Sequence, residues 1–258
     1  MSGAFSALGL YLSYYVYNKT GNKGLTSGVF FFFTMEFLQF IQYFFINQCD
    51  NTVNQVLTIL GFLHICLQPY FTHVINSSLT RSPTKLAQWR IIHKLALMGG
   101  GLLFLRWVAT FLDGQTNDVN GTQLIASGQC PSTEWLRGDK LCTMKGLYHL
   151  KWAVPMVDAT YLPWQPGIAI HSFLMFAPFF AMDRCWIQGL FLYATGPLLG
   201  AFITPDLQEQ ASIWCFFSIA QIALMVLAIR NVFVLKKGEK KAKSISIGGA
   251  KSDGKKAK

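Results

Sequence analysis

Charged residues are scarce in this sequence, and their scarcity argues against an ordinary soluble domain. Only 13% of the 258 residues are charged, whereas 52% are hydrophobic, and the charged share is about half of that usual in soluble domains. The charges are also unevenly placed, since nine of the 22 Lys and Arg lie in residues 236–258. Because the net charge of +10 belongs largely to that segment, we expect it to bind anionic lipid headgroups rather than nucleic acid.

Motifs that would reveal a particular chemistry are also missing. The sequence has no Cys-x-x-Cys pair, no His-Glu-x-x-His and no two histidines four residues apart, so we expect no metal site. It has no Gly-x-Ser-x-Gly motif of a serine hydrolase. The apolar segment 210–234 contains neither a lysine for retinal nor an Asn-Pro-x-x-Tyr motif. We therefore expect no cofactor, and the sequence leaves open whether the chain is an enzyme.

Long apolar runs dominate the chain instead. A run of roughly 17–25 apolar residues can cross a hydrocarbon core of about 30 Å as a helix. The runs predict an all-α fold, a multi-pass transmembrane helical bundle over residues 1–235, followed by a disordered lysine-rich tail over 236–258. Seven spans are expected, with six as the alternative because the first is short. The predicted spans are 3–17, 27–47, 53–76, 89–112, 165–182, 185–203 and 210–234.

Loop charges predict the orientation of this bundle. Cytosolic loops carry an excess of Lys and Arg, and long loops follow this rule weakly. With seven spans and a cytosolic C-terminus, the N-terminus faces outward. The short outer loops 48–52 and 204–209 then carry no Lys or Arg, and the exception is the long outer loop 113–164. The basic residues of the inner loops are Lys19, Lys23, Arg81, Lys85 and Arg184.

The long outer loop 113–164 is expected to be modified at two places. Cys130 and Cys142 both lie in it and are predicted to form a disulfide in an oxidising compartment, with Cys49 either free or a competing partner. Asn120 begins an Asn-Gly-Thr glycosylation sequon on the same side. Both predictions depend on the outward orientation of this loop.

Two further segments predict where parts of the chain lie. Residues 145–166 are rich in Trp, Tyr and Pro, so we expect them at the outer membrane interface. Residues 255–258, Lys-Lys-Ala-Lys, resemble the dilysine signal of endoplasmic reticulum membrane proteins. The predicted location is therefore the endoplasmic reticulum or another endomembrane, with the plasma membrane as the alternative.

Polar side chains inside apolar spans are costly, so they mark candidate sites. Glu36 and Gln39 share one helix face, as do His64 and Gln68 in the next span. A carboxylate opposite an imidazole can relay protons, bind a cation or act as an acid/base pair, and it can also simply hold helices together. The candidates for a polar path or ligand site are Glu36, Gln39, His64, Gln68, Arg106, Asp158, His171 and Gln221.

These candidates support a leading hypothesis and two alternatives. The first is a small transporter or channel-like protein whose path passes Glu36, His64 and Gln221. The second is an intramembrane enzyme acting on a lipid or other apolar substrate, with Glu36 or Asp158 in general acid–base chemistry and His171 and Arg106 binding a polar headgroup. The third is a structural subunit of a membrane complex, whose polar groups would all be used in internal pairs.

Overall fold

The structure, a computed structural model, is mostly helical and contains one small β-sheet. It describes residues 2–80, 82–112, 135–156, 168–182 and 185–227. The elements are α1 (Ser2–Thr20), α2 (Lys23–Gln42), α3 (Thr52–Leu79), α4 (Pro83–Leu112), β1 (Cys142–Lys145), β2 (Leu150–Ala153), α6 (Ile168–Ala181), the continuous helix of α7 (Trp186–Tyr193), η2 (Ala194–Leu198) and α8 (Leu199–Ile203), and helix Leu207–Leu227.

Four of the sequence predictions fall on other parts of the chain. The Asn120 sequon, Cys130, Asp158 and the tail 236–258 lie outside the described residues.

Five of the described helices are long and apolar enough to cross a membrane. Each overlaps a span predicted from the sequence, although the boundaries differ. The helix of α4 begins at Pro83 rather than at residue 89, because proline is well tolerated at the first helical position. The other two predicted spans correspond to α6, with 14 residues, and α1, with 19, which are not among these five helices. The five are Lys23–Gln42, Thr52–Leu79, Pro83–Phe111, Trp186–Ile203 and Leu207–Leu227.

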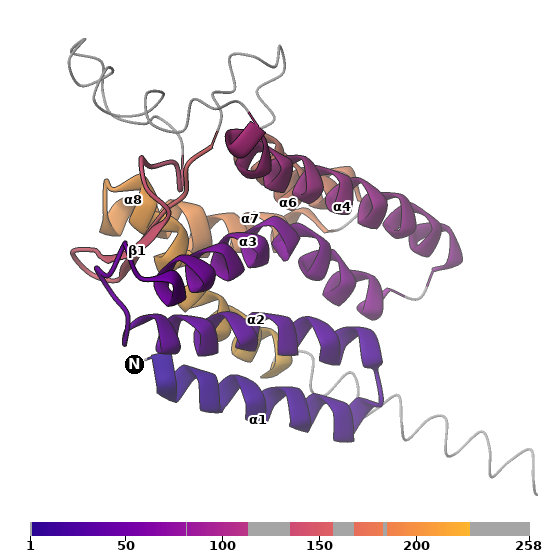
Figure 1. The fold of residues 1–258 in the computed structure, drawn as a ribbon. Coiled ribbons are helices and arrows are strands. Elements are labelled where there is room, and N and C mark those ends of the chain that lie inside the picture. Colours follow the sequence, from indigo (N-terminus) through magenta and orange to yellow (C-terminus); the bar gives the residue numbers. More distant parts are fainter. Residues whose placement is uncertain (1, 81, 113–134, 157–167, 183–184, 228–258) are drawn as a thin grey trace, which may run out of the picture.

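Asparagine side chains fix where α2 and α3 begin. Asn22 accepts a hydrogen bond from the backbone N–H of Leu25 at 3.0 Å, and Asn51 accepts one from Val53 at 2.8 Å. Each satisfies a backbone donor that has no partner within the first helical turn. The short connections that contain these caps let α1, α2 and α3 pack side by side in succession (Figure 1).

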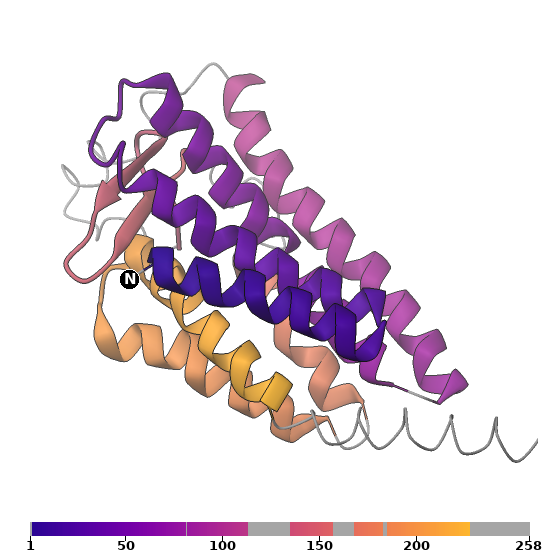
Figure 2. The same cartoon turned by 90° about the horizontal axis from the view of Figure 1, so that it is seen from below.

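The helix α3 lies at the centre of the bundle. It packs against α2, α4, α6 and β1, and Figure 2 shows it between the other helices when the molecule is turned. Its contact with α4 depends on Gly100, since any side chain there would collide with the carbonyl oxygen of Cys66. One apolar core joins α3 to α4, the hairpin and helix 207–227, and a second joins α1, α2, α3 and helix 207–227.

Part of the loop 113–164, predicted to face outward, folds into a β-hairpin, so the prediction of an all-α chain is wrong here. β1 and β2 pair antiparallel, with Cys142 opposite Ala153, and Gly146 N–H donates to the carbonyl of His149 across the turn at 2.7 Å. Trp152 is only 1% exposed, inside the first apolar core. Residues 150–156 of the predicted interfacial segment are therefore packed into the protein, where burial of the Trp152 ring outweighs its preference for headgroups, whereas Leu147 and Tyr148 in the turn are exposed. Residues 157–166 of that segment lie outside the described residues.

Polar side chains at the start of α3 hold the hairpin in place. Asn54 accepts a hydrogen bond from Thr143 N–H at 2.9 Å and donates one to its carbonyl at 2.9 Å. The hydroxyls of Thr58 and Thr143 are 2.8 Å apart. On the other strand, Trp152 donates to Gln42 at 3.1 Å. Since buried polar groups of this kind need partners, they fix the register of the hairpin against the helices.

A disulfide joins Cys49 to Cys142, so the predicted pair Cys130–Cys142 is wrong. The chain brings residue 49, between α2 and α3, directly beside β1, because Thr143 is held by Asn54 and also accepts from Asn47 N–H at 3.1 Å. The Cα atoms of the two cysteines are 4.9 Å apart, within the usual range for a disulfide. Proximity in sequence favoured Cys130, whereas the fold brings the more distant Cys49 to Cys142.

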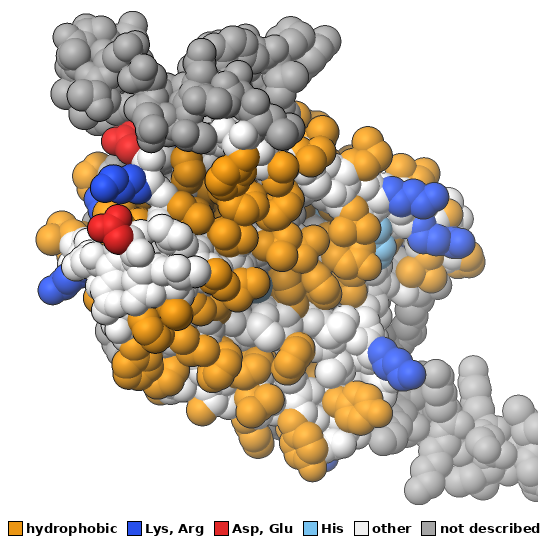
Figure 3. Space-filling view, viewed as in Figure 1, with side chains coloured by type: hydrophobic (Ala, Val, Ile, Leu, Met, Phe, Trp, Pro, Cys, Tyr) orange, Lys and Arg blue, Asp and Glu red, His pale blue; other side chains and the backbone are white. Residues whose placement is uncertain are grey.

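Large apolar side chains remain exposed over the helices. They include exposed Phe, Leu, Tyr and Met side chains on α1, α2, α4 and α7. Figure 3 shows hydrophobic side chains spread across the middle of one face, with charged side chains toward its two ends. Soluble monomers rarely expose contiguous apolar patches of this extent, so this surface fits the lipid contact that the composition predicts.

Candidate binding cavity

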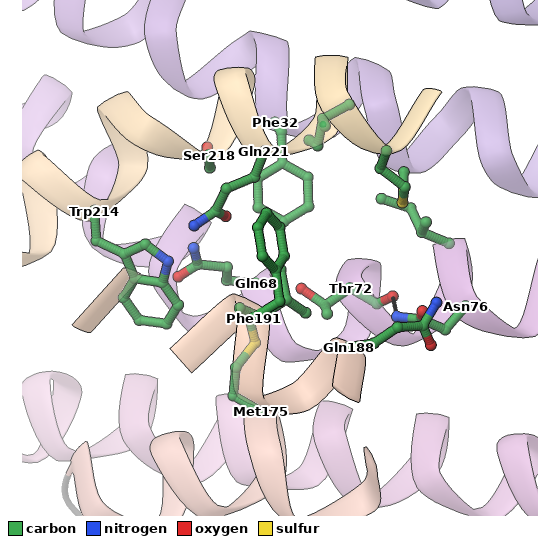
Figure 4. Close-up of a pocket in the computed structure, with 14 residues that line it drawn as sticks. Phe32, Gln68, Thr72, Asn76, Met175, Gln188, Phe191, Trp214, Ser218 and Gln221 are labelled. Atoms are coloured by element: carbon green, nitrogen blue, oxygen red, sulfur yellow. Dashed lines mark hydrogen bonds between the residues drawn. The ribbon is translucent and has the colours of Figure 1, made fainter. Parts of the chain in front are cut away.

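A cavity of about 90 Å³ lies between α3, α6, α7 and helix 207–227 (Figure 4). This volume is several times the roughly 10–15 Å³ needed to hold one water. Aromatic and aliphatic side chains form most of its wall, and amides and hydroxyls interrupt them, a combination common in ligand sites. The lining residues are Phe32, Gln68, Thr72, Ile75, Asn76, Met175, Gln188, Phe191, Leu192, Trp214, Ser218, Gln221, Ile222 and Met225.

One wall is a polar stripe on α3. Gln68, Thr72 and Asn76 are four residues apart and so share a helix face. Asn76 donates to the backbone carbonyl of Thr72 at 2.7 Å. Gln68 is fully buried, and neither its amide nitrogen nor its oxygen has a hydrogen-bond partner; the Thr72 hydroxyl also lacks one. An unsatisfied buried polar group costs about 1–3 kcal/mol, so a bound molecule that hydrogen-bonds Gln68 would recover this energy.

The facing wall positions a second amide. In Figure 4 the side chains of Gln221 and Gln68 point toward one another. Gln221 donates to the Thr195 hydroxyl at 2.7 Å, and that hydroxyl donates to the Phe191 carbonyl at 2.6 Å. Thr195 belongs to η2, a π-helical turn containing Pro197. Such turns are frequent at functional sites, and here the turn orients the amide of Gln221.

Charge is absent from the described wall of this cavity. None of its lining residues is ionisable. A charged molecule inside the apolar bundle would need an opposite charge to offset its desolvation. The described wall therefore fits an uncharged molecule that both donates and accepts hydrogen bonds.

His171, a predicted site residue, bonds to another helix instead of lining the cavity. Its Nε2 lies 2.8 Å from the carbonyl oxygen of Ile65 on α3. That carbonyl would normally accept from the residue four positions later, but this residue is Pro69, which has no N–H. Because a carbonyl only accepts, the Nε2 of His171 carries the proton. His171 thus replaces a hydrogen bond that proline removes from α3.

A histidine of α3 likewise bonds to a carbonyl of α6 that has lost its backbone donor to a proline. His73 on α3 has its Nε2 2.7 Å from the carbonyl oxygen of Leu174 on α6, and the residue four positions after Leu174 is Pro178. Neighbouring helices commonly satisfy the groups that a proline frees in a membrane helix. We call these two bonds the reciprocal histidine clamp, and it joins α3 to α6.

His64 also serves helix packing. Its Nε2 lies 2.8 Å from the carbonyl oxygen of Phe31 on α2, and its ring stacks on that of Phe31 with centroids 3.7 Å apart. The residue four positions after Phe31 is Met35, which retains its N–H, so no proline frees this carbonyl. His64 does not line the cavity, and the predicted path past His64 has no support in this geometry.

The remaining predicted residues also lie away from the cavity wall. Glu36 and Gln39 share one face of α2 as predicted, and Gln39 donates to the carbonyl of Ser212 on helix 207–227 at 3.5 Å. Arg106 is buried on α4. The cavity brings together Gln68 and Gln221 from the predicted set and excludes the other described members.

A buried carboxylate that the sequence did not single out organises the hairpin end. Glu209 accepts hydrogen bonds from the N–H groups of Tyr148 and His149, both at 2.6 Å, and from the Thr204 hydroxyl at 2.9 Å. Burial lowers the pKa of His149 to about 4, although the charge of Glu209 acts in the opposite direction. Glu209 lies at the edge of an apolar run, where an acidic residue is typical of an exposed loop, so no sequence signal identified it.

The chain belongs to a family of unknown function, DUF5765, whose family model matches residues 1–234. No curated protein and no solved structure matches the chain. The family match covers every described element. Since it names no activity, the function must be argued from the cavity.

Proposed function

We propose that the chain is a small transporter or channel-like membrane protein that takes an uncharged polar solute into the cavity at Gln68. One observation carries the proposal: Gln68 is fully buried beside the cavity, and both of its amide atoms lack a partner. In a purely structural subunit, such an amide would be paired inside the bundle. In an enzyme using acid–base chemistry, an ionisable group would be expected within reach of the substrate, and none lines the described wall.

The polar stripe of α3 gives this cavity a direction. Eight residues separate Gln68 from Asn76, which corresponds to roughly 12 Å along a helix. Asn76 lies in the last turn of α3, and Gln188, at the same end of the cavity in Figure 4, is exposed in the first turn of α7. The proposed solute route therefore runs from the middle of the bundle toward the end opposite the hairpin.

The proposal includes seven spans with the hairpin end outside and the other end in the cytosol. Three features support it. The described helices run back and forth between the two ends (Figures 1 and 2), and the disulfide at the hairpin end fits an oxidising compartment. Among the described residues, the opposite end carries Lys19, Lys23 and Lys85 without an acidic residue. At the hairpin end four acidic residues, Asp50, Asp139, Asp206 and Glu209, are balanced by four basic ones, Arg137, Lys140, Lys145 and Lys151.

Urea flux into proteoliposomes tests the proposal, because urea is uncharged and offers the donors and acceptors that Gln68 lacks. We expect the protein to raise urea permeability above that of protein-free liposomes, measured by stopped-flow light scattering. Gln68→Leu keeps the side chain's approximate size but removes its hydrogen bonds. It should lower the protein-dependent rate at least about tenfold, which corresponds to about 1.4 kcal/mol in the barrier.

Gln48→Leu is the matched control, because Gln48 is exposed between α2 and α3 and does not line the cavity. It should leave urea permeability unchanged. The proposal fails if the wild-type protein adds no urea permeability, or if correctly folded Gln68→Leu protein is as permeable as the wild type.

A further inference from the structure

We propose that Glu36 is a proton-binding site inside the bundle, reached from the hairpin end. Its carboxyl group is fully buried on α2, and neither oxygen has a hydrogen-bond partner among the residues that the structure describes. The cavity does not include Glu36, so this inference does not depend on the proposed solute site.

The neighbours of Glu36 come from three helices and are mainly neutral. Ser2 on α1 is a polar neighbour, and its hydroxyl is also without a partner. Cys215 on helix 207–227 and Tyr43 at the end of α2 are close enough to interact with it electrostatically. Two charged groups act in this region. The amino-terminal amine acts on Glu36, and Glu209 acts together with Glu36 on Tyr43.

The absence of hydrogen bonds to Glu36 indicates whether its carboxyl group is protonated or ionised in this position. An ionised carboxylate needs several donors when it is buried, and Glu209 shows what such a site looks like in this protein, with three donors on its two oxygens. Glu36 has none. An isolated buried charge is far more costly than a buried neutral group, so Glu36 holds a proton in this conformation. It can release that proton only when donors or water reach it.

A line of polar groups on the hairpin side of Glu36 marks the route that we propose for the proton. Gln39, one turn along the same face of α2, donates to the carbonyl of Ser212 at 3.5 Å, and its own amide oxygen has no partner. The Ser212 hydroxyl lies 3.3 Å from the Nδ1 of His149 and also bonds to the backbone carbonyls of Leu150 and Glu209. His149 is only partly buried, in the turn of the hairpin. The line therefore leads from the hairpin surface to Glu36.

Infrared spectroscopy of the full chain in lipid nanodiscs tests the proposal directly. At pH 7 we expect the C=O stretch of a protonated carboxylic acid in the wild-type protein. Glu36→Gln, which copies the size and neutrality of the protonated side chain, should abolish this band. Glu209→Gln should leave it in place, because the proposal assigns the band to Glu36, whereas both oxygens of Glu209 accept hydrogen bonds.

Exchange into D₂O then tests the route. The band should shift as the acid proton is replaced by deuterium, and Ser212→Ala should slow this shift. The proposal is overturned if the wild-type spectrum at pH 7 equals that of Glu36→Gln, or if the band belongs to Glu209. It is also overturned if Ser212→Ala leaves the exchange rate unchanged, since the proton would then arrive by another side.

Discussion

Replacing Cys142 with serine is expected to lower the free energy of unfolding by about 2–5 kcal/mol. The Cys49–Cys142 bond joins positions 93 residues apart and so closes a long loop of the unfolded chain. It also ties β1 to the connection between α2 and α3, where Asn47 contacts the same strand, as Asn54 does from the start of α3. The measurement is SDS-induced unfolding of the purified protein in mixed micelles.

Cys185→Ser is the matched control, because Cys185 is a free cysteine outside the bond, and it should leave stability nearly unchanged. Peptide mapping of the unreduced protein should recover the Cys49–Cys142 pair. A Cys130–Cys142 peptide, or equal stabilities of the Cys142→Ser variant and the wild type, would show that this account of the hairpin end is wrong.

The second large effect is expected at the reciprocal histidine clamp. His171→Leu leaves the Ile65 carbonyl without a donor, because Pro69 cannot supply one, and should cost about 1–3 kcal/mol. In a Pro69→Ala background the residue at 69 regains an N–H that can pair with Ile65. The cost of His171→Leu should therefore fall in that background, as a double-mutant cycle would show.

His64→Leu provides the comparison for this cycle. Its acceptor, Phe31, lies four residues before Met35, which keeps its N–H. After loss of the His64 side chain, the Phe31 carbonyl thus keeps its backbone donor. The loss of stability caused by His64→Leu should therefore not depend on Pro69. Equal costs of His171→Leu with and without Pro69 would contradict the clamp.

The helices could be predicted from the sequence, whereas the partners of their polar side chains could not. Apolar runs placed helices near their observed positions because hydropathy depends on local composition. The i, i+3 spacing also places Glu36 and Gln39 on one helix face, and the i, i+4 spacing places His64 and Gln68 on one face of the next helix. Spacing does not say which neighbouring helix a face meets, so His64 and Glu36 were assigned to one path although neither lines the cavity.

Other features depended on contacts between distant segments. The partner of Cys142 lies 93 residues away, and the hairpin depends on Asn54 and Thr58 from α3 as much as on its own strands. Pro69 and Pro178 each remove a backbone donor from their helix. Only the packing of α3 on α6 shows that a histidine of each helix bonds to the carbonyl that the proline of the other helix leaves free. Gln68 and Gln221 can be recognised in the sequence as polar residues within apolar runs. The sequence does not show that their side chains face the same cavity.

The polar residues of the bundle therefore serve different purposes. His73 and His171 restore hydrogen bonds that prolines remove, and His64 joins α3 to α2. Gln68 and Gln221 face a cavity without described charge. Glu36 lies apart from that cavity, without a hydrogen-bond partner. Of the described candidates named from the sequence, only Gln68 and Gln221 line this cavity.

The most direct test of the solute site is a high-resolution structure of the full chain in nanodiscs equilibrated with selenourea, a heavier analogue of urea. The account predicts solute density in the cavity, within about 2.7–3.2 Å of the Gln68 amide as a hydrogen bond requires. The same density should be missing from the Gln68→Leu protein. A cavity filled by a lipid chain, or a Gln68 amide paired with protein groups and no solute, would contradict the account.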